Sequence, residues 1–459
     1  MGDERRNATV DMTAGNSLKL MLRFSLPILL GNLFQQMYTV VDGIVVGKSV
    51  STEALAAVGV GFPITYMLTS IFLGLGLGAS VLVSQHFGNR DMAQVRQTIS
   101  TMNTFLLIIA VPITLLGIFT IDPFLRLLGT DSAIFQDAKL YMVIYYVGML
   151  PQFGYNVNAN VLQGIGDSKT PLYILIASSA LHIVLAVLLV TVFPFGVAGV
   201  AWSTVLSQGF SWALSIYLIR RKYPEIGSAF RQFRVHRETF KKTLRVGVPI
   251  GIQNALFSLG MMVMQPLING FGAVFIAGYN AAVKVDGFIF MPVTSLAAAV
   301  TTFVGQNIGA RRMDRVKEGT RSAILLALAL CVLLCAVVIP LRTPLMRLFT
   351  DDQAVVDAGN AYLLRVIPLY FISTLQYMYI GVLRGSGQTL VPTVATLVSL
   401  WLARVPAAYL LTSRFGPNNM HWCYAAGWVM GLAILIPYYY LGRWKKGLIK
   451  GETPAQAAP

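Results

Sequence analysis

The stretch "SQHFGNRDMAQV" (residues 84–95) returns 221 positions later as "GQNIGARRMDRV" (305–316). Two further blocks keep nearly the same distance. "LQGIGDSKTP" (162–171) corresponds to "LRGSGQTLVP" (383–392), again at 221, and "RFSLPILLGN" (23–32) shares its Arg, Pro, Ile and Asn with "RVGVPIGIQN" (245–254) at 222. Three separate blocks that hold one offset indicate that the chain is a duplicated unit.

The composition is that of an integral membrane protein. Of the 459 residues, 56% are hydrophobic and 12% are charged, whereas soluble domains carry about 25% charged residues. The net charge of +16 could suggest nucleic acid. However, the basic residues crowd alternate loops, above all positions 220–245, as the positive-inside rule requires. We therefore expect the lipid bilayer as the partner, no nucleic acid, and both termini in the cytoplasm.

The apolar runs predict an all-α protein with twelve transmembrane helices. They are bounded by Gly, Pro and charged residues, and we expect them near 18–46, 54–84, 98–120, 132–161, 171–193, 197–219, 243–270, 275–304, 320–342, 354–382, 391–412 and 421–442. Six crossings return the chain to its starting side, so the two copies share one orientation and are related by a pseudo-two-fold axis along the membrane normal.

The duplication also predicts the domain organisation. We expect two six-helix lobes that could rock against each other around a cavity, which is the basis of alternating access; duplication for stability alone is the other interpretation. The segments are a cytoplasmic tail (1–17), an N-lobe (18–219), a basic cytoplasmic linker (220–242), a C-lobe (243–442) and a second cytoplasmic tail (443–459).

Asp42 lies inside the first apolar run, in "YTVVDGIVVGKSV" (38–50). A carboxylate inside such a helix costs roughly 2.5–3.5 kcal/mol on insertion scales. Helical spacing places Gln35, Tyr38 and Thr39 on the same face, so that the acid belongs to a polar stripe. This pattern favours a functional acid, and the alternative is a structural carboxylate bonded to Tyr38 or to a neighbouring helix.

The whole chain resembles the multidrug and toxic compound extrusion (MATE) transporters, most closely the MepA-like and DinF-like bacterial members. The blocks that carry the resemblance are "FSLPILLGNLFQQMYTVVDGIVVG", "VSQHFGNRDMAQV", "LQGIGDSKTP", "FVGQNIGARRMDRV" and "LRGSGQ". The resemblance implies a secondary active antiporter, not an enzyme, that exports lipophilic, often cationic compounds in exchange for protons or sodium ions. It also implies a multi-pass protein of a bacterial cytoplasmic membrane, which we expect to act as a monomer.

The resemblance places Asp42 at the family's first-helix aspartate, which is thought to bind the coupling ion. Many relatives add an Asn and an Asp on the fifth helix, but this chain has His182 and Ala186 there. Thr204 still matches the family's hydroxyl position. Because a sodium ion would lose a charged oxygen ligand, the proton becomes the expected coupling ion, with His182 as a candidate relay. His182 as a neutral packing residue is the alternative, and we expect no metal or other cofactor.

The remaining candidates concern the cavity and the second lobe. Asp286 and Arg404 are predicted to form a structural ion pair near Lys284, because buried charges need partners; Asp286 could instead face the cavity and meet a cation. The polar and aromatic residues expected to line the substrate cavity are Gln35, Asn156, Asn160, Gln253, Asn254, Tyr279, Asn280, Asp286, Gln376 and Tyr377.

Three other features of the sequence could indicate a function other than drug transport. The glycine-rich "GLGLGAS" (74–80) lacks a Walker lysine and predicts close helix packing through Gly74 and Gly78. "GIGD" (164–167) fits the intramembrane aspartyl protease pattern, a remote alternative, but Asp167 is expected at the opposite side of the membrane from Asp42. The main competitor is a flippase for lipid-linked saccharides, which would need more cationic residues than Lys284 and Arg404.

Overall fold

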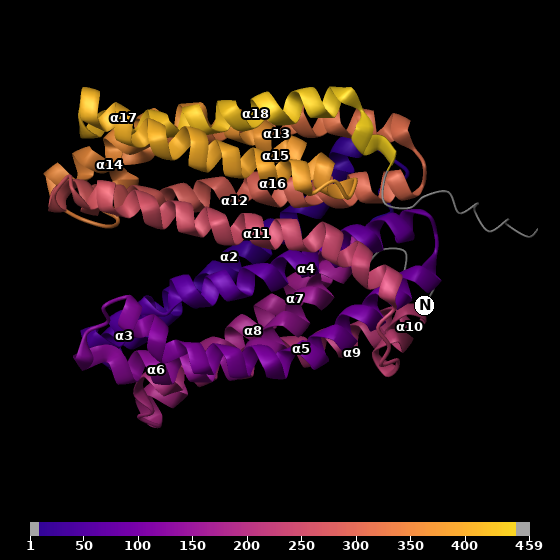
Figure 1. Cartoon of the computed structure of the whole chain (residues 1–459), viewed down its shortest axis with the longest axis horizontal. Helices are drawn as coiled ribbons and strands as arrows, with labels where there is room; N and C mark the ends of the chain where they lie inside the picture. The colour runs from indigo at the N-terminus through magenta and orange to yellow at the C-terminus, as the bar shows by residue number, and fades with distance from the viewer. Residues whose placement is uncertain (1–8, 447–459) are drawn as a thin grey trace, which may run out of the picture. The chain divides into compact units, whose positions relative to one another are not determined.

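The computed structural model describes residues 9–446, and this part of the chain is helical without a strand (Figure 1). Ten of its helical stretches are long and apolar enough to cross a membrane. The two other predicted spans are helical as well. One is interrupted at Gly148, which separates two helices of 16 residues each, and the other is rich in serine and glycine. The prediction of twelve helices is therefore confirmed.

The first half of the chain contains one long helix or one interrupted helix for each predicted span. In chain order these are α2 (Ser17–Ser49), α3 (Thr52–Val60) with α4 (Phe62–Gly88), α5 (Met92–Leu127), α6 (Ser132–Val147) with α7 (Met149–Gly164), α8 (Lys169–Val187) with the π-helix η1 (Leu188–Val192), and α9 (Gly196–Lys222). The short α10 (Pro224–Gly227) and η2 (Ser228–Arg231) follow in the basic linker.

The second half repeats this pattern. It consists of α11 (Arg237–Asn269), α12 (Ala273–Gly309), α13 (Met313–Arg347), α14 (Gln353–Val366) with η3 (Ile367–Leu369) and α15 (Tyr370–Gly385), α16 (Leu390–Leu397) with the π-helix η4 (Val398–Arg404) and α17 (Val405–Phe415), and η5 (Pro417–Trp422) with α18 (Cys423–Leu441) and η6 (Arg443–Lys446). Both α2 and α11, the opening helices of the two copies, are 33 residues long.

The turns after α4 and α12 show that the repeat extends to backbone geometry. Arg90 and Arg311, which are 221 positions apart, have φ angles of 59° and 58°. Side chains other than glycine rarely adopt this left-handed conformation. The turns after α7 and α15 match in the same way, since Gly166 and Gly387 have φ angles of 89° and 83°. The duplication therefore preserved the geometry of both turns.

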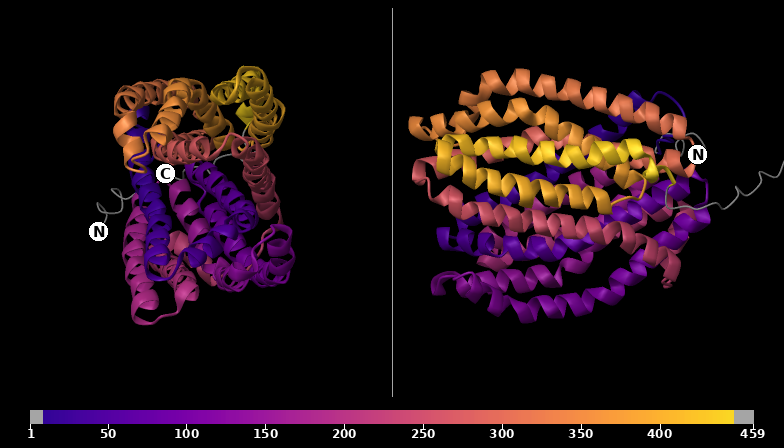
Figure 2. Two further views of the ribbon diagram at one scale, coloured as in Figure 1. Left: turned by 90° about the vertical axis from the view of Figure 1, so that its left-hand side faces the viewer. Right: turned by 45° about the horizontal axis from the view of Figure 1, so that its top comes forward.

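The described chain divides into two compact units, each made mostly of one copy. Unit 1 comprises residues up to Asp11 and Leu26–Gly251, and unit 2 comprises Met12–Ser25 and the residues from Ile252 onward. Within each unit the long helices run roughly side by side, as both views of Figure 2 show. The first residues of α2 thus belong to the unit built mainly from the second copy, and the first residues of α11 belong to unit 1.

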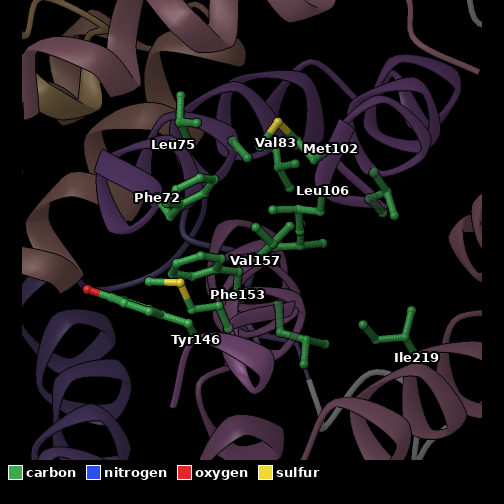
Figure 3. Close-up of a cluster of buried hydrophobic side chains, with 14 of the residues drawn as sticks. Phe72, Leu75, Val83, Met102, Leu106, Tyr146, Phe153, Val157 and Ile219 are labelled. Carbon is green, nitrogen blue, oxygen red and sulfur yellow. The ribbon is translucent and has the colours of Figure 1, made fainter. Parts of the chain in front are cut away.

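The core of unit 1 lies between α4, α5, α6 and α7 (Figure 3). Phe72 and Phe153 stack there with ring centroids 4.0 Å apart, and the fully buried Tyr146 lies in the same cluster.

A second contact of unit 1 joins α4 to the first part of α11, and the two backbones approach each other without side chains between them. A Cβ on Gly74 would lie 2.4 Å from the backbone of Gly251, and one on Gly78 would lie 2.9 Å from that of Gly247. The predicted close packing through Gly74 and Gly78 is confirmed.

The N-terminal residues assigned to unit 2 are held by a cluster of polar side chains. The Met12 backbone donates to Gln306 Oε1 at 3.0 Å and accepts from Asn307 Nδ2 at 3.0 Å. Arg315 Nη2 donates to the carbonyl of Gly15 at 2.8 Å. These bonds satisfy backbone groups that precede α2 and would otherwise be buried without partners.

Candidate functional site

Asp42 on α2 and His182 on α8 form the centre of the site in unit 1. Asp42 Oδ1 lies 3.2 Å from His182 Nε2, and the two side chains are 17% and 1% exposed. The contact lacks the alignment of a hydrogen bond, since Oδ1 is buried without a hydrogen-bond partner within the described chain. An acid and a titratable base thus meet inside two apolar helices, where their interaction depends on which of them carries the proton.

Tyr38 supports this pair from one helical turn away on α2. Its hydroxyl donates to Ser178 Oγ at 2.8 Å, and its ring packs on the His182 imidazole with centroids 4.3 Å apart. Ser178 precedes His182 by four residues, as Tyr38 precedes Asp42. The two helices are therefore connected by two successive contacts on facing sides, because residues four apart share a helix face.

The third helix of the site is α9. Thr204 Oγ1 lies 3.4 Å from His182 Nε2 and also donates to the Val200 carbonyl at 3.2 Å. The structure thus brings together four of the five residues predicted for ion coupling. The fifth, Thr39, lies on α2, but its side chain falls outside the described part of the structure.

Two neighbours of the site were missed by the sequence analysis. Ser178 could have been found from its four-residue spacing to His182. Tyr141 on α6 is close enough to Asp42 to interact with it electrostatically. No local pattern marks Tyr141, because its proximity depends on how α6 packs.

Unit 2 places Asp286 and Arg404 differently from the prediction. No ion pair within 4.0 Å joins their charged atoms in the described residues, so the predicted direct pair is not formed. The Arg404 guanidinium instead lies 3.8 Å from the ring centroid of Tyr424. Arg404 still acts electrostatically on Asp286. The predicted third member, Lys284, lies 5.9 Å from the ring centroid of Phe349.

Three tyrosine hydroxyls form a chain beside this arginine. Tyr424 Oη lies 3.2 Å from both Tyr279 Oη and Tyr362 Oη. Tyr279, predicted for the cavity, is 5% exposed and therefore belongs to the buried interior of unit 2.

The other predicted cavity residues are spread over both units. In unit 1, Asn156 and Asn160 donate to carbonyls of their own helix at 2.8 Å, and Gln35 is exposed. In unit 2, Gln253 and Gln376 are buried, Asn254 and Tyr377 are half-buried, and Asn280 is exposed. Gln253 bonds to side chains of two other helices, as described below.

Asp167, the residue of the protease-like motif, is a fully buried helix cap. Its carboxylate accepts from the backbone N–H groups of Lys169 and Thr170 and from the Tyr223 hydroxyl at 2.8 Å. Burial first, and then the adjacent carboxylate, raise the pKa of Tyr223, so this phenol remains a donor. With its oxygens bonded in this way, Asp167 ties the start of α8 to the end of α9.

The fold and the buried charges define a multi-pass membrane protein built from two copies of a six-helix unit. The MatE family profile matches the chain twice, at residues 27–188 and 249–410, with the copies 222 positions apart. The chain therefore belongs to the multidrug and toxic compound extrusion family, as its sequence motifs predict.

Relatives and solved structures match along nearly the whole chain. The probable multidrug resistance protein YpnP of Bacillus subtilis is 31% identical over 95% of this chain and 97% of its own. The probable multidrug resistance protein NorM of Thermotoga maritima is 26% identical over 93% of each chain. An outward-facing multidrug resistance MATE family transporter of the MOP superfamily has the same fold, with a TM-score of 0.88 at 23% identity, covering 95% of this chain and 99% of its own.

Proposed function

We propose that this protein is a secondary active multidrug exporter, not an enzyme, that exchanges lipophilic, often cationic compounds for protons by alternating access. Two features support transport: the duplicated six-helix architecture and relatives that are named probable multidrug resistance proteins. The observation that carries the coupling is the 3.2 Å contact between Asp42 and His182 inside apolar helices.

The chemistry of this pair favours a proton over a sodium ion. Sodium prefers oxygen ligands, but Asp42 has an imidazole as its neighbour, and a protonated imidazole would repel a metal cation. A proton that binds Asp42 removes the charge that attracts the ring. The ring can then rotate away from the acid, and Tyr38, which packs on it and bonds to Ser178, transmits this change between α2 and α8.

The charge distribution supports the orientation of the exporter. The basic residues fall on alternate loops, which favours a bacterial cytoplasmic membrane with both chain ends in the cytoplasm. We expect the protein to act as a monomer, because each copy of the repeat supplies one of the two lobes that alternating access requires.

The test is ethidium efflux from vesicles in which a pH gradient or a sodium gradient is imposed separately. We expect the pH gradient to drive efflux by the wild type and the sodium gradient at fixed pH to have no effect. Asp42→Asn at normal protein level should abolish the gradient-driven part. Efflux driven by sodium alone would contradict proton coupling, and full efflux by Asp42→Asn would contradict the role of the acid.

A flippase for lipid-linked saccharides is the second candidate. The observation that favours it is a further cationic side chain in the helices of unit 2, Arg384, in addition to Lys284 and Arg404. Lipid pyrophosphate requires such charges. The same vesicles distinguish the two functions, because a flippase would translocate a labelled lipid-linked saccharide and leave ethidium inside.

A further inference from the structure

Arg384 is a half-buried cation whose protein partner is neutral. It lies in the last turn of α15, and its Nη2 donates to Gln253 Oε1 at 2.9 Å. Among residues 9–446, no carboxylate lies within 4.0 Å of its guanidinium. Its Nε is buried and has no hydrogen-bond partner. A partly buried charge without a counter-charge inside a membrane-spanning helix is still costly, and it marks a candidate functional site.

The neutral partner is itself held in place. Gln253 on α11 is 6% exposed, and its Nε2 donates to Thr396 Oγ1 on α16 at 2.7 Å. This bond fixes the amide so that its oxygen faces the arginine. Three helices of unit 2 therefore orient one guanidinium, whose Nε–H has no acceptor within the described chain.

Arg384 differs in this respect from Lys284 and Arg404, two other cations in the helices of unit 2. Lys284 and Arg404 each lie over an aromatic ring, which stabilises a cation without a ligand. No such ring contact holds Arg384 in the described chain. Tyr377, two helical turns earlier on α15, is near enough to act on it electrostatically and presents its ring to Phe290 at 4.9 Å between centroids.

We propose that Arg384, oriented by Gln253 and Thr396, binds the oxyanion of an amphiphilic ligand. A guanidinium matches the geometry of a carboxylate or phosphate and forms strong charge-assisted hydrogen bonds with it. The ligand carries an aromatic or apolar body beside this anion, which Tyr377 and Phe290 accommodate. The inference rests on the proposed transport function and extends its substrates to zwitterionic or anionic amphiphiles. The oxyanion comes either from the transported compound or from a phospholipid headgroup.

Two fluorescent dyes test whether the oxyanion comes from the transported compound. Rhodamine 110 carries a free carboxylate, and rhodamine 123 is its methyl ester. In vesicles, Arg384→Gln should lower the ratio of rhodamine 110 to rhodamine 123 efflux at least about tenfold, as expected for the loss of one charge-assisted hydrogen bond. Arg384→Lys should restore part of the ratio. The control is Arg414→Gln, an exposed arginine on α17 of the same unit, which should leave the ratio unchanged.

Thermal unfolding of the purified protein tests, without any transport, whether the oxyanion comes from a phospholipid headgroup. If a lipid phosphate occupies the site, phosphatidylglycerol should raise the unfolding temperature of the wild type but not that of Arg384→Gln, and the dye ratio should stay constant. The proposal is overturned if Arg384→Gln changes neither the dye ratio nor the lipid-dependent stabilisation. A wild type that moves neither dye, while the lipid effect is present, would contradict the transport function alone.

Discussion

Unit 1 and unit 2 carry a basic side chain at the same point of the repeat, but the two bases behave differently. His182 and Arg404 are 222 positions apart, and each has a tyrosine and an acid in its surroundings, Tyr141 with Asp42 in unit 1 and Tyr362 with Asp286 in unit 2. Histidine can lose its charge near neutral pH, whereas arginine remains charged in proteins.

The position of the acid also differs. Asp42 comes from the first helix of its copy and touches the base at 3.2 Å. The corresponding position of unit 2 is the buried Met264, and the acid comes instead from α12 and makes no ion pair within 4.0 Å with the guanidinium in the described residues. We infer that the pair in unit 1 is built to change its charge and the group in unit 2 to keep its charge constant.

The largest expected effect is the difference in transport between substitutions of the two acids, Asp42 and Asp286. Asp42→Asn should reduce gradient-driven efflux to the background of vesicles without the protein, because the amide cannot exchange a proton. Asp286→Asn should lower the amount of folded protein more than it changes drug selectivity. Efflux per molecule, with protein quantified by immunoblot, measures both. Equal loss of efflux per molecule in the two variants would remove the functional contrast between the units.

The next largest effect concerns the stability of unit 2. Arg404→Met removes a buried cation that lies on Tyr424 and acts on the half-buried Asp286, which should cost on the order of 3 kcal/mol of unfolding free energy. Thermal unfolding of the purified protein measures the change. Arg414→Met is the matched control, because Arg414 is exposed. A variant at Arg404 as stable as this control would show that the cation does not support the unit.

His182, the base of unit 1, should affect the pH dependence of efflux rather than the stability of the protein. His182→Gln keeps a polar side chain beside Asp42 but cannot titrate, so efflux should fall about tenfold, equivalent to about 1.4 kcal/mol. The dependence of efflux on pH should flatten, because the amide does not bind a proton. His182→Arg gives unit 1 the permanent charge of unit 2 and should impair efflux further. An unchanged pH profile in His182→Gln would assign His182 to packing.

The sequence predicts features that depend on periodicity and duplication. The twelve helices, the repeat and the close packing at Gly74 follow from local patterns. The meeting of Asp42 with His182 was suggested by the positions of both residues in a known family. Local patterns are less informative where a contact depends on side chains that fill the space between helices. Asp286 and Arg404 make no ion pair within 4.0 Å in the described residues, and the guanidinium lies against Tyr424, which no sequence pattern indicates. Arg384 was missed because its lack of a counter-charge is visible only once its neighbours are known.

The smallest expected effect is the difference in stability between substitutions of Tyr362 and Tyr141. Tyr362→Phe removes a hydroxyl that donates to Tyr424 at 3.2 Å and should cost about 1 kcal/mol of unfolding free energy. Tyr141 makes no hydrogen bond through its hydroxyl within the described residues. Tyr141→Phe should therefore change stability by less than about 0.5 kcal/mol. Thermal unfolding of both variants under one condition tests this order. If Tyr141→Phe were the more destabilising, the hydroxyl in unit 1 would be structural, and the contrast between a variable and a constant charge would lose its support.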